Sequence, residues 1–166
     1  RPSLLSMRSG PQGAQLVLIE ADAAAPSALK LASLGPPIGT RMRWLSHTSD
    51  GARLLAVHTP HIGGVLHRYR REGDRLVSEH VLDNLSNHAV GSRELDVSAW
   101  VDSRLVIADR TRKHLLIIDT DRASVVARLD GVGTVVQIAN GPDDDSVACL
   151  TSEGTLLLVH RLPVPR

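Results

Sequence analysis

Short apolar runs alternate with short polar breaks along most of the chain. Between residues 104 and 131, the runs LVIA, LLII and SVVARL are separated only by DRTRKH and DTDRA. Runs of about four to eight residues rich in Val, Ile and Leu are typical of β-strands, whereas an amphipathic helix needs about 10–12 residues with a 3.6-residue period. The pattern therefore predicts strands at residues 95–101, 105–108, 115–119 and 124–129.

The same pattern continues on both sides of this segment. Upstream it predicts the strands SLLSMRS, QLVLIEA, ALKLASL, MRWLSH, RLLAVH, VLHRYR and RLVSEHVL, and downstream it predicts VVQIA, SVACLT and TLLLVHR. Segments such as TSDG, REGD, NGPDDD and SEG lie between them, and their Asp, Asn and Gly residues favour tight turns. The sequence therefore predicts an all-β fold of fourteen strands joined as antiparallel hairpins.

The predicted strands fall into four repeating units. Their third strands begin near Leu16, Val65, Leu115 and Thr155, so successive units lie 40 to 50 residues apart. A repeat of about 40–50 residues with four strands is typical of a propeller blade. The first and last units contain three strands rather than four. The predicted units of this single domain span residues 1–35, 41–84, 94–131 and 132–163.

Two segments resemble β-propeller blades of the WD40 or YVTN/NHL-like kind. The segment WLSHTSDGARLL (44–55) resembles the turn between the first two strands of a blade, and RLVIADRTRKHLLIIDTDRASVVARL (104–129) resembles a YVTN-type blade. The Trp-Asp dipeptide that ends a third strand in WD40 repeats is missing, and so is their Gly-His dipeptide. The subfamily therefore stays open.

The resemblance implies an arc of about four antiparallel four-stranded blades, of which the first and last are incomplete. Propeller rings usually contain four to eight blades, and we expect this arc to belong to a ring of seven or eight. In the alternative arrangement, the two incomplete units share strands and close a four-bladed ring. Pro163 and Pro165 disfavour a further paired strand after the last run. An open arc exposes apolar sheet faces and unpaired edges, which are association surfaces.

The composition narrows the partners that we expect. Hydrophobic residues make up 42% and charged residues 22% of the chain, and the net charge of +1 does not indicate nucleic acid or an acidic membrane as partner. The aromatic residues Trp44, Tyr69 and Trp100 are too few for a platform that stacks single-stranded nucleic acid. No apolar run approaches the length of about 20 residues that a membrane-spanning helix needs.

The single cysteine, Cys149, lies in the apolar run SVACLT and is expected to be a buried thiol. It cannot form an internal disulfide and no signal peptide is visible, so the sequence favours an intracellular protein. The sequence begins at Arg1 rather than at a methionine. It therefore leaves open the alternative that this chain is part of a longer protein with a targeting segment.

No motif predicts a catalytic residue, a metal site or a cofactor. The segment HTPHIGGVLH lacks the spacing of a known zinc motif, and NGPDDDS lacks the alternating acidic positions of an EF-hand. The GxSxG, GxGxxG and P-loop motifs do not occur. The polar candidates on predicted inner strands, Asp96, Ser98 and Asn140, are too few for a metal cage.

We expect binding to other proteins through loops at 58–64, 84–93 and 110–114 and through an Arg-rich hairpin. The candidate interaction residues are His58, His61, Arg68, Arg70, Asn87, His88, Arg110, Arg112 and Lys113. If neighbouring units bring the basic residues together, they form a patch for an acidic peptide or phosphate. Interspersed acidic residues such as Glu72 and Asp109 favour a mixed, solvated face instead.

The preferred function is a non-catalytic β-propeller scaffold for protein–protein interactions within a larger complex, whose partners include other protein subunits and the rest of its own ring. No cofactor is expected for such a scaffold. The first alternative is part of a propeller enzyme, such as a lactonase-like hydrolase or a quinone-dependent dehydrogenase, whose site needs further blades. The second alternative is an Arg-rich rim that binds phosphate or nucleic acid.

Overall fold

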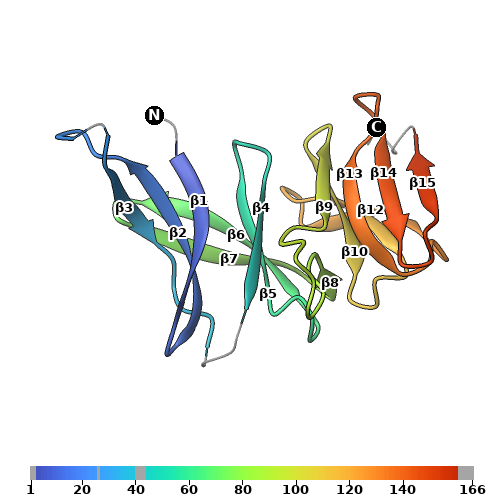
Figure 1. The fold of residues 1–166 in the computed structure, drawn as a ribbon, viewed down its shortest axis with the longest axis horizontal. Coiled ribbons are helices and arrows are strands. Elements are labelled where there is room, and N and C mark those ends of the chain that lie inside the picture. Colours follow the sequence, from blue (N-terminus) through green and yellow to red (C-terminus); the bar gives the residue numbers. More distant parts are fainter. Residues whose placement is uncertain (1–2, 26, 40–43, 161–166) are drawn as a thin grey trace.

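The structure is a computed structural model that describes residues 3–25, 27–39 and 44–160. These residues form fifteen strands and no helix, which confirms the all-β prediction (Figure 1). The strands build three sheets that follow one another in chain order along the longest axis of the molecule (Figure 1). The described part of the chain accordingly holds no helix with the length and hydrophobicity to cross a membrane.

The first sheet has seven strands in the order β1-β2-β3-β7-β6-β5-β4. They are β1 (Ser3–Gly10), β2 (Gly13–Ala21), β3 (Leu29–Leu34), β4 (Leu45–Ser49), β5 (Leu54–His58), β6 (Val65–Glu72) and β7 (Arg75–Asp83). Neighbouring strands are antiparallel except for β3 and β7, which are parallel and pair only at Leu34 and Arg75. The edge strands β1 and β4 lie close together, so the sheet is nearly closed and barrel-like.

The first two predicted units therefore share one hydrogen-bonded sheet. Sequence periodicity predicts hairpins, because each hairpin is formed within one short segment. It does not predict the β3–β7 contact, which joins strands from two different units. Backbone and side-chain hydrogen bonds reinforce this contact: the Leu34 amide donates to the carbonyl of Asp74 at 3.1 Å, and the Ser33 hydroxyl donates to the carbonyl of Gly73 at 3.1 Å.

The second sheet contains β9 (Ser98–Val101), β10 (Arg104–Asp109), β11 (Leu115–Asp119) and β12 (Ser124–Leu129), and the two-residue strand β8 (Leu85–Ser86) pairs with the end of β10. The third sheet contains β13 (Val135–Asn140), β14 (Val147–Thr151) and β15 (Leu156–Val159). Most predicted strands agree with these bounds. The predicted strand at 42–47 lies partly outside the described residues, and so do the end of the last predicted strand and both C-terminal prolines.

Three hydrophobic clusters hold the strands together, and each cluster lies between two consecutive predicted units. One joins β2 to β4–β7, a second joins β5–β7 to β10 and β11, and a third joins β9–β11 to β13 and β14. Cys149 is fully buried in the third cluster, which confirms the expectation of a buried thiol. Apolar side chains of consecutive units therefore pack against one another in chain order.

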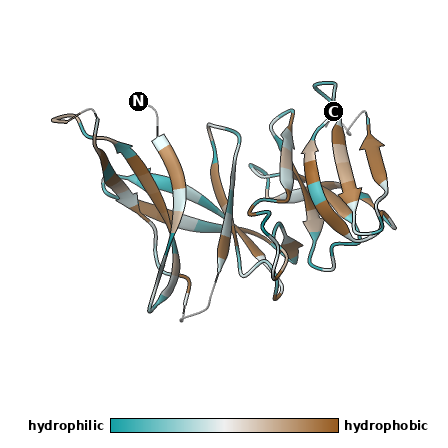
Figure 2. Ribbon diagram, viewed as in Figure 1, coloured by the Kyte–Doolittle hydropathy of each residue, from teal (hydrophilic) through white to brown (hydrophobic). Residues whose placement is uncertain are grey.

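The continuous apolar runs of β10 and β11 follow from burial on both faces of the second sheet. Leu105 and Ile107 pack toward the first sheet, whereas Val106 and Ala108 pack toward the third sheet. Side chains alternate between the two faces of a strand, so a strand covered on both faces is apolar at every position. This explains why LVIA and LLII show no polar alternation (Figure 2).

The segment after β7 differs from the sequence prediction. Residues 84–93 are predicted to form a polar loop that is free to bind, but Leu85–His88 are buried. The Leu85 amide donates to the carbonyl of Gly64 at 2.9 Å, and the carbonyl of Asn87 accepts from the Val97 amide at 2.7 Å. The first bond ties the segment to the residue before β6 of the first sheet, and the second bond ties it to the residue before β9. β9 begins at Ser98 rather than at residue 95 as predicted.

Candidate functional site

A polar hollow of about 600 Å³ lies where β4, β9 and β13 approach one another, and we call it the inner hollow. These strands are the first strands of three consecutive units, and they lie side by side in Figure 1. Asp96, Ser98 and Asn140, the polar candidates that the sequence placed on predicted inner strands, all lie at this hollow. The other lining residues are Thr48, Ser49, Asp50, Ala99, Trp100 and Ser103.

A chain of hydrogen bonds connects the walls of the inner hollow. The Trp100 indole donates to the Thr48 hydroxyl at 2.9 Å, and the hydroxyls of Thr48 and Ser98 lie 2.9 Å apart. The Ser98 hydroxyl donates to Oδ1 of Asp96 at 2.6 Å, and the Asn87 side-chain amide donates to the same oxygen at 3.1 Å. The chain therefore links the first and second sheets through side chains whose partners the sequence did not reveal.

The Asp96 carboxylate has only neutral hydrogen-bond donors around it. Asp96 is exposed, but many protein atoms surround its carboxyl group, and this desolvation raises its pKa against the opposing effect of the Ser98 and Asn87 hydrogen bonds. Desolvation also lowers the pKa of the nearby His47, although Asp96 acts in the opposite direction. Of the described Lys and Arg side chains, none forms an ion pair with Asp96.

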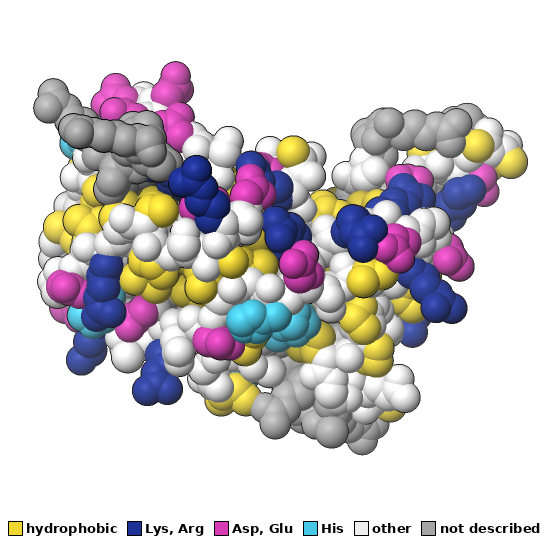
Figure 3. All heavy atoms as spheres, turned by 180° about the vertical axis from the view of Figure 1, so that it is seen from behind, with side chains coloured by type: hydrophobic (Ala, Val, Ile, Leu, Met, Phe, Trp, Pro, Cys, Tyr) yellow, Lys and Arg dark blue, Asp and Glu magenta, His cyan; other side chains and the backbone are white. Residues whose placement is uncertain are grey.

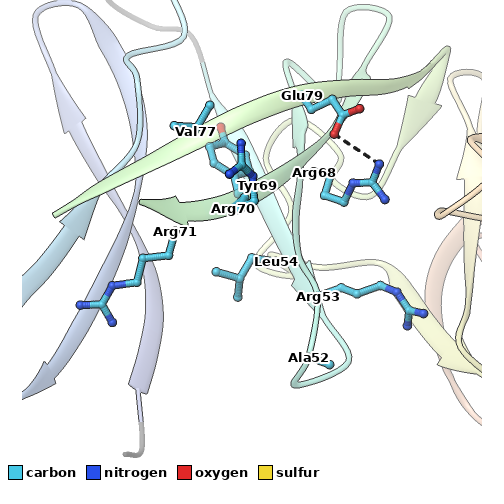
Figure 4. A pocket seen from close by; sticks show the side chains of 9 residues that line it. All are labelled: Ala52, Arg53, Leu54, Arg68, Tyr69, Arg70, Arg71, Val77 and Glu79. Carbon is cyan, nitrogen blue, oxygen red and sulfur yellow. Dashed lines mark hydrogen bonds and ion pairs between the residues drawn. The ribbon is translucent and has the colours of Figure 1, made fainter. Parts of the chain in front are cut away.

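A second hollow of about 520 Å³ lies over β5–β7 of the first sheet, and we call it the arginine groove (Figure 4). Arg53, Arg68, Arg70 and Arg71 line it together with Tyr69, Val77 and Glu79. In Figure 4, Arg53 and Arg71 point in opposite directions. Two of these arginines, Arg68 and Arg70, are among the interaction residues predicted from the sequence.

Each arginine of the groove is paired with a carboxylate. Arg53 contacts Asp50 and Asp121, Arg68 contacts Glu79 and Asp121, Arg70 contacts Glu72, and Arg71 contacts Glu20. The pairs that include Asp121 also join the first sheet to the β11–β12 turn of the second sheet. On the face seen in Figure 3, basic and acidic side chains are interspersed. The groove is therefore compensated in charge rather than basic.

The other predicted basic residues do not join this groove. Arg110, Arg112 and Lys113 lie in the β10–β11 loop, at the opposite end of β11 from the turn that carries Asp121. The loop is held by its backbone: the Arg110 amide donates to the carbonyl of Asn84 at 2.8 Å, and the carbonyl of Arg112 accepts from the Val135 amide at 2.7 Å. The single basic patch considered from the sequence is therefore not formed.

The histidines form a row on the first sheet. The rings of His58 and His67 are stacked with centroids 3.8 Å apart, and His80 meets His67 edge-on at 6.1 Å. Burial, with the neighbouring His67, lowers the pKa of His58 to about 3. Nε2 of His58 lies 2.7 Å from the Tyr69 hydroxyl, which can donate to an uncharged imidazole. Across the described ranges, no three His, Cys, Asp or Glu side chains are placed to hold a metal ion.

The remaining predicted residues lie beside the buried segment after β7. Asn87 is fully buried, and His88 is also buried and stacks on Trp44 with centroids 5.6 Å apart. His61 is exposed in the turn after β5, and its ring lies edge-on to His88 at 6.4 Å. The side chains of Asn87 and His88 therefore lie inside the protein, where the Asn87 amide donates a hydrogen bond to Asp96. Because both side chains are polar, the sequence did not indicate that they are buried.

Comparison of the chain with models of protein families gives no match, and comparison with curated proteins gives no significant match.

Proposed function

We propose that this chain is an arc of a β-propeller-like scaffold that mediates protein–protein interactions through the outward face of its last sheet. The packing of consecutive sheets supports this proposal, because the first and second sheets share one hydrophobic cluster and the second and third sheets share another. In a propeller, neighbouring blades pack through their faces in the same way. The two ends of such an arc then each carry one face without a neighbouring unit.

The outward face of the third sheet is the observation that carries the proposal. On β14 and β15, Val147, Cys149, Leu157 and Val159 contact the third hydrophobic cluster. The intervening residues point the other way and are also apolar: Ala148 pairs with Leu158, and Leu150 pairs with Leu156. Leu156 is 70% and Leu158 is 45% exposed. The outward face is thus as apolar as the inward face of the same two strands. In the described structure no other sheet packs on it, and its two leucines on β15 are exposed.

The occupant that fits this face is another β-sheet with an apolar face, because the inner face of the same sheet is covered in that way. A second copy of the chain supplies such a sheet. On the outward side of the first sheet, Ile19 pairs with both Leu4 and Leu31, and these two leucines are exposed. The last face of one copy against the first face of another makes a heterologous contact, which two copies can close into a ring.

Sedimentation velocity over a range of protein concentrations tests the proposal. We expect the wild-type chain to self-associate reversibly and the double variant Leu156→Thr/Leu158→Thr to remain monomeric, because threonine keeps a high strand preference but removes apolar surface. Val125→Thr is the matched control, because Val125 is an exposed apolar residue of β12, away from the outward face. Circular dichroism verifies that each variant keeps its strands.

Two outcomes contradict the proposal. In the first, the wild-type chain is monomeric at every concentration. In the second, the double variant associates as strongly as the wild type and the control do, so that the contact uses another surface.

A further inference from the structure

We propose that the inner hollow binds an organic cation, the ammonium or guanidinium group of a lysine or arginine side chain, against the carboxylate of Asp96. This site is separate from the outward face of the third sheet, and it adds a specific recognition site to the proposed scaffold.

The hydrogen-bond chain directs its donors toward Asp96. The Trp100 indole nitrogen can only donate, so the Thr48 hydroxyl accepts from it, and the proton of that hydroxyl is left for Asp96, with which Thr48 also forms a side-chain hydrogen bond. The Ser98 hydroxyl in turn donates to Asp96 at 2.6 Å. The fully buried Asn87 adds a second donor to the same oxygen, Oδ1. The carboxylate is thus fixed in place as the end point of a chain of neutral donors.

In the described structure no cationic side chain forms an ion pair with this carboxylate, and burial favours the uncharged form of the nearby His47 by lowering its pKa. The other acidic residue of the hollow, Asp50, is already paired with Arg53, and Arg53 is shared with Asp121. In the described part of the chain, Asp96 has no such ion pair. A carboxylate held among protein atoms without a counter-ion gains most from a charged donor, because hydrogen bonds between charged groups are stronger than neutral ones. Desolvation raises the pKa of Asp96, and a bound cation would oppose that effect.

The remaining lining residues fit a cation with several N–H groups. Ser103 contributes a hydroxyl oxygen and Asn140, at the end of β13, contributes an amide oxygen, whereas the Ser49 hydroxyl is already bonded to the backbone of Gly51 and Arg53. An ammonium group has three donors and a guanidinium group has five, so both need acceptors besides one carboxylate. The volume of about 600 Å³ is large enough to admit the end of a long side chain rather than a single ion.

The two tryptophans make this binding directly measurable by nuclear magnetic resonance. The indole N–H of Trp100 belongs to the hydrogen-bond chain, whereas the indole N–H of Trp44 has no hydrogen-bond partner in the described structure. The chain is titrated with Nα-acetyl-arginine amide and with Nα-acetyl-lysine amide. Nα-acetyl-citrulline amide, which is nearly isosteric with the arginine probe but neutral, is the matched control ligand.

We expect the cationic probes to shift the Trp100 indole signal in a saturable manner and the citrulline probe to leave it unchanged. Asp96→Asn is expected to weaken binding about tenfold or more, in line with the loss of a charge-assisted hydrogen bond. Asp74→Asn, in the exposed β6–β7 turn, is expected to bind like the wild type. Asn140→Lys keeps Asp96 but places a competing ammonium group at the hollow, and it is expected to weaken binding as well.

The proposal fails if no saturable shift occurs, if citrulline binds as well as arginine, or if Asp96→Asn binds as tightly as the wild type. If Asp96→Asn does not fold, Asn140→Lys decides: unchanged binding in that variant also overturns the proposal. Leu156→Thr/Leu158→Thr leaves the inner hollow intact, so cation binding in that variant separates this proposal from the association through the third sheet.

Discussion

The second and third sheets are built from similar apolar runs but have different surroundings. In β10 and β11 of the second sheet, nearly every residue is buried, because one face packs on the first sheet and the other on the third. In β14 and β15, only every second residue reaches the hydrophobic cluster. An apolar run therefore indicates how many faces of a strand carry apolar side chains. This holds whether or not another sheet covers each of those faces in the structure.

The largest effect expected from this comparison concerns protein stability. Ile107→Ala removes a fully buried side chain from β10 and is expected to lower the free energy of unfolding by about 2–5 kcal/mol. Leu158→Ala removes a half-exposed side chain from β15 and is expected to cost less than about 1 kcal/mol. Urea denaturation at concentrations where the chain is monomeric measures both values. Equal losses in the two variants would contradict the difference between the sheets.

A second test extends the comparison to a buried ionisable group in the first sheet. The pKa of His58 is about 3 in the folded protein, below the value of about 6.5 for a free histidine, so the unfolded state binds more protons as the pH falls below 6.5. The contribution of the uncharged His58 to the free energy of unfolding is fully present above pH 6.5. We expect it to fall by about 1–2 kcal/mol between pH 7 and pH 5.

The variant His58→Gln isolates this effect, because it removes the titrating group and keeps a polar side chain near Tyr69. Urea denaturation at several pH values is expected to show a smaller loss of stability on acidification in His58→Gln than in the wild type. The exposed His160 provides the control variant His160→Gln. A pH dependence that is identical in wild type and His58→Gln would show that His58 is not responsible.

A third test compares the two faces of the third sheet by thiol chemistry. Burial raises the pKa of the Cys149 thiol, so its reaction with Ellman's reagent in the folded protein is expected to be slow. In the variant Cys149→Ser/Leu158→Cys, the only thiol lies on the outward face and is expected to react at least about tenfold faster. If both thiols react equally fast, the inner face of the third sheet is as open as its outward face.

The smallest effect is expected from the ion pairs that join the first and second sheets. Asp121→Asn breaks the contacts of this carboxylate with Arg53 and Arg68, but the Asp121 side chain is 60% exposed. Exposed ion pairs contribute about 0–1 kcal/mol, so the loss of stability is expected to stay below about 1 kcal/mol and to shrink at high salt. Thermal unfolding at low and high salt measures it, with the exposed Asp144→Asn as the control.

The sequence predicted local structure well, because hairpins depend on neighbouring residues. The runs around Leu105, Leu115 and Ser124 became β10, β11 and β12, and the turn residue Asp119 accepts backbone hydrogen bonds from Asp121 and Arg122 as expected for a tight turn. The prediction of fourteen strands missed only the short β8, whose pairing with β10 spans a loop.

The parts that the sequence could not predict depend on contacts between distant residues. The parallel contact of β3 with β7 and the burial of Asn87 leave no periodic pattern, because each involves only a few hydrogen bonds between residues far apart in the sequence. For the inner hollow, Asp96 and Ser98 were recognised as polar residues near an inner strand. Thr48 and Trp100 were not, since nothing in their neighbouring sequence shows that their side chains meet across two sheets.

The β3–β7 contact has a consequence for how the chain can be divided. Because β3 pairs with β7 and β2 contributes to the hydrophobic cluster shared with β4–β7, the first three strands remain attached to the rest of the protein by contacts other than the peptide link that follows β3. Cutting the chain between β3 and β4 gives two pieces, one with β1–β3 and one with the remaining strands. Each piece carries strand edges and apolar residues that complement those of the other. The first three strands and the remaining chain are thus suited to fragment complementation, in which two separately produced pieces reassemble into one fold.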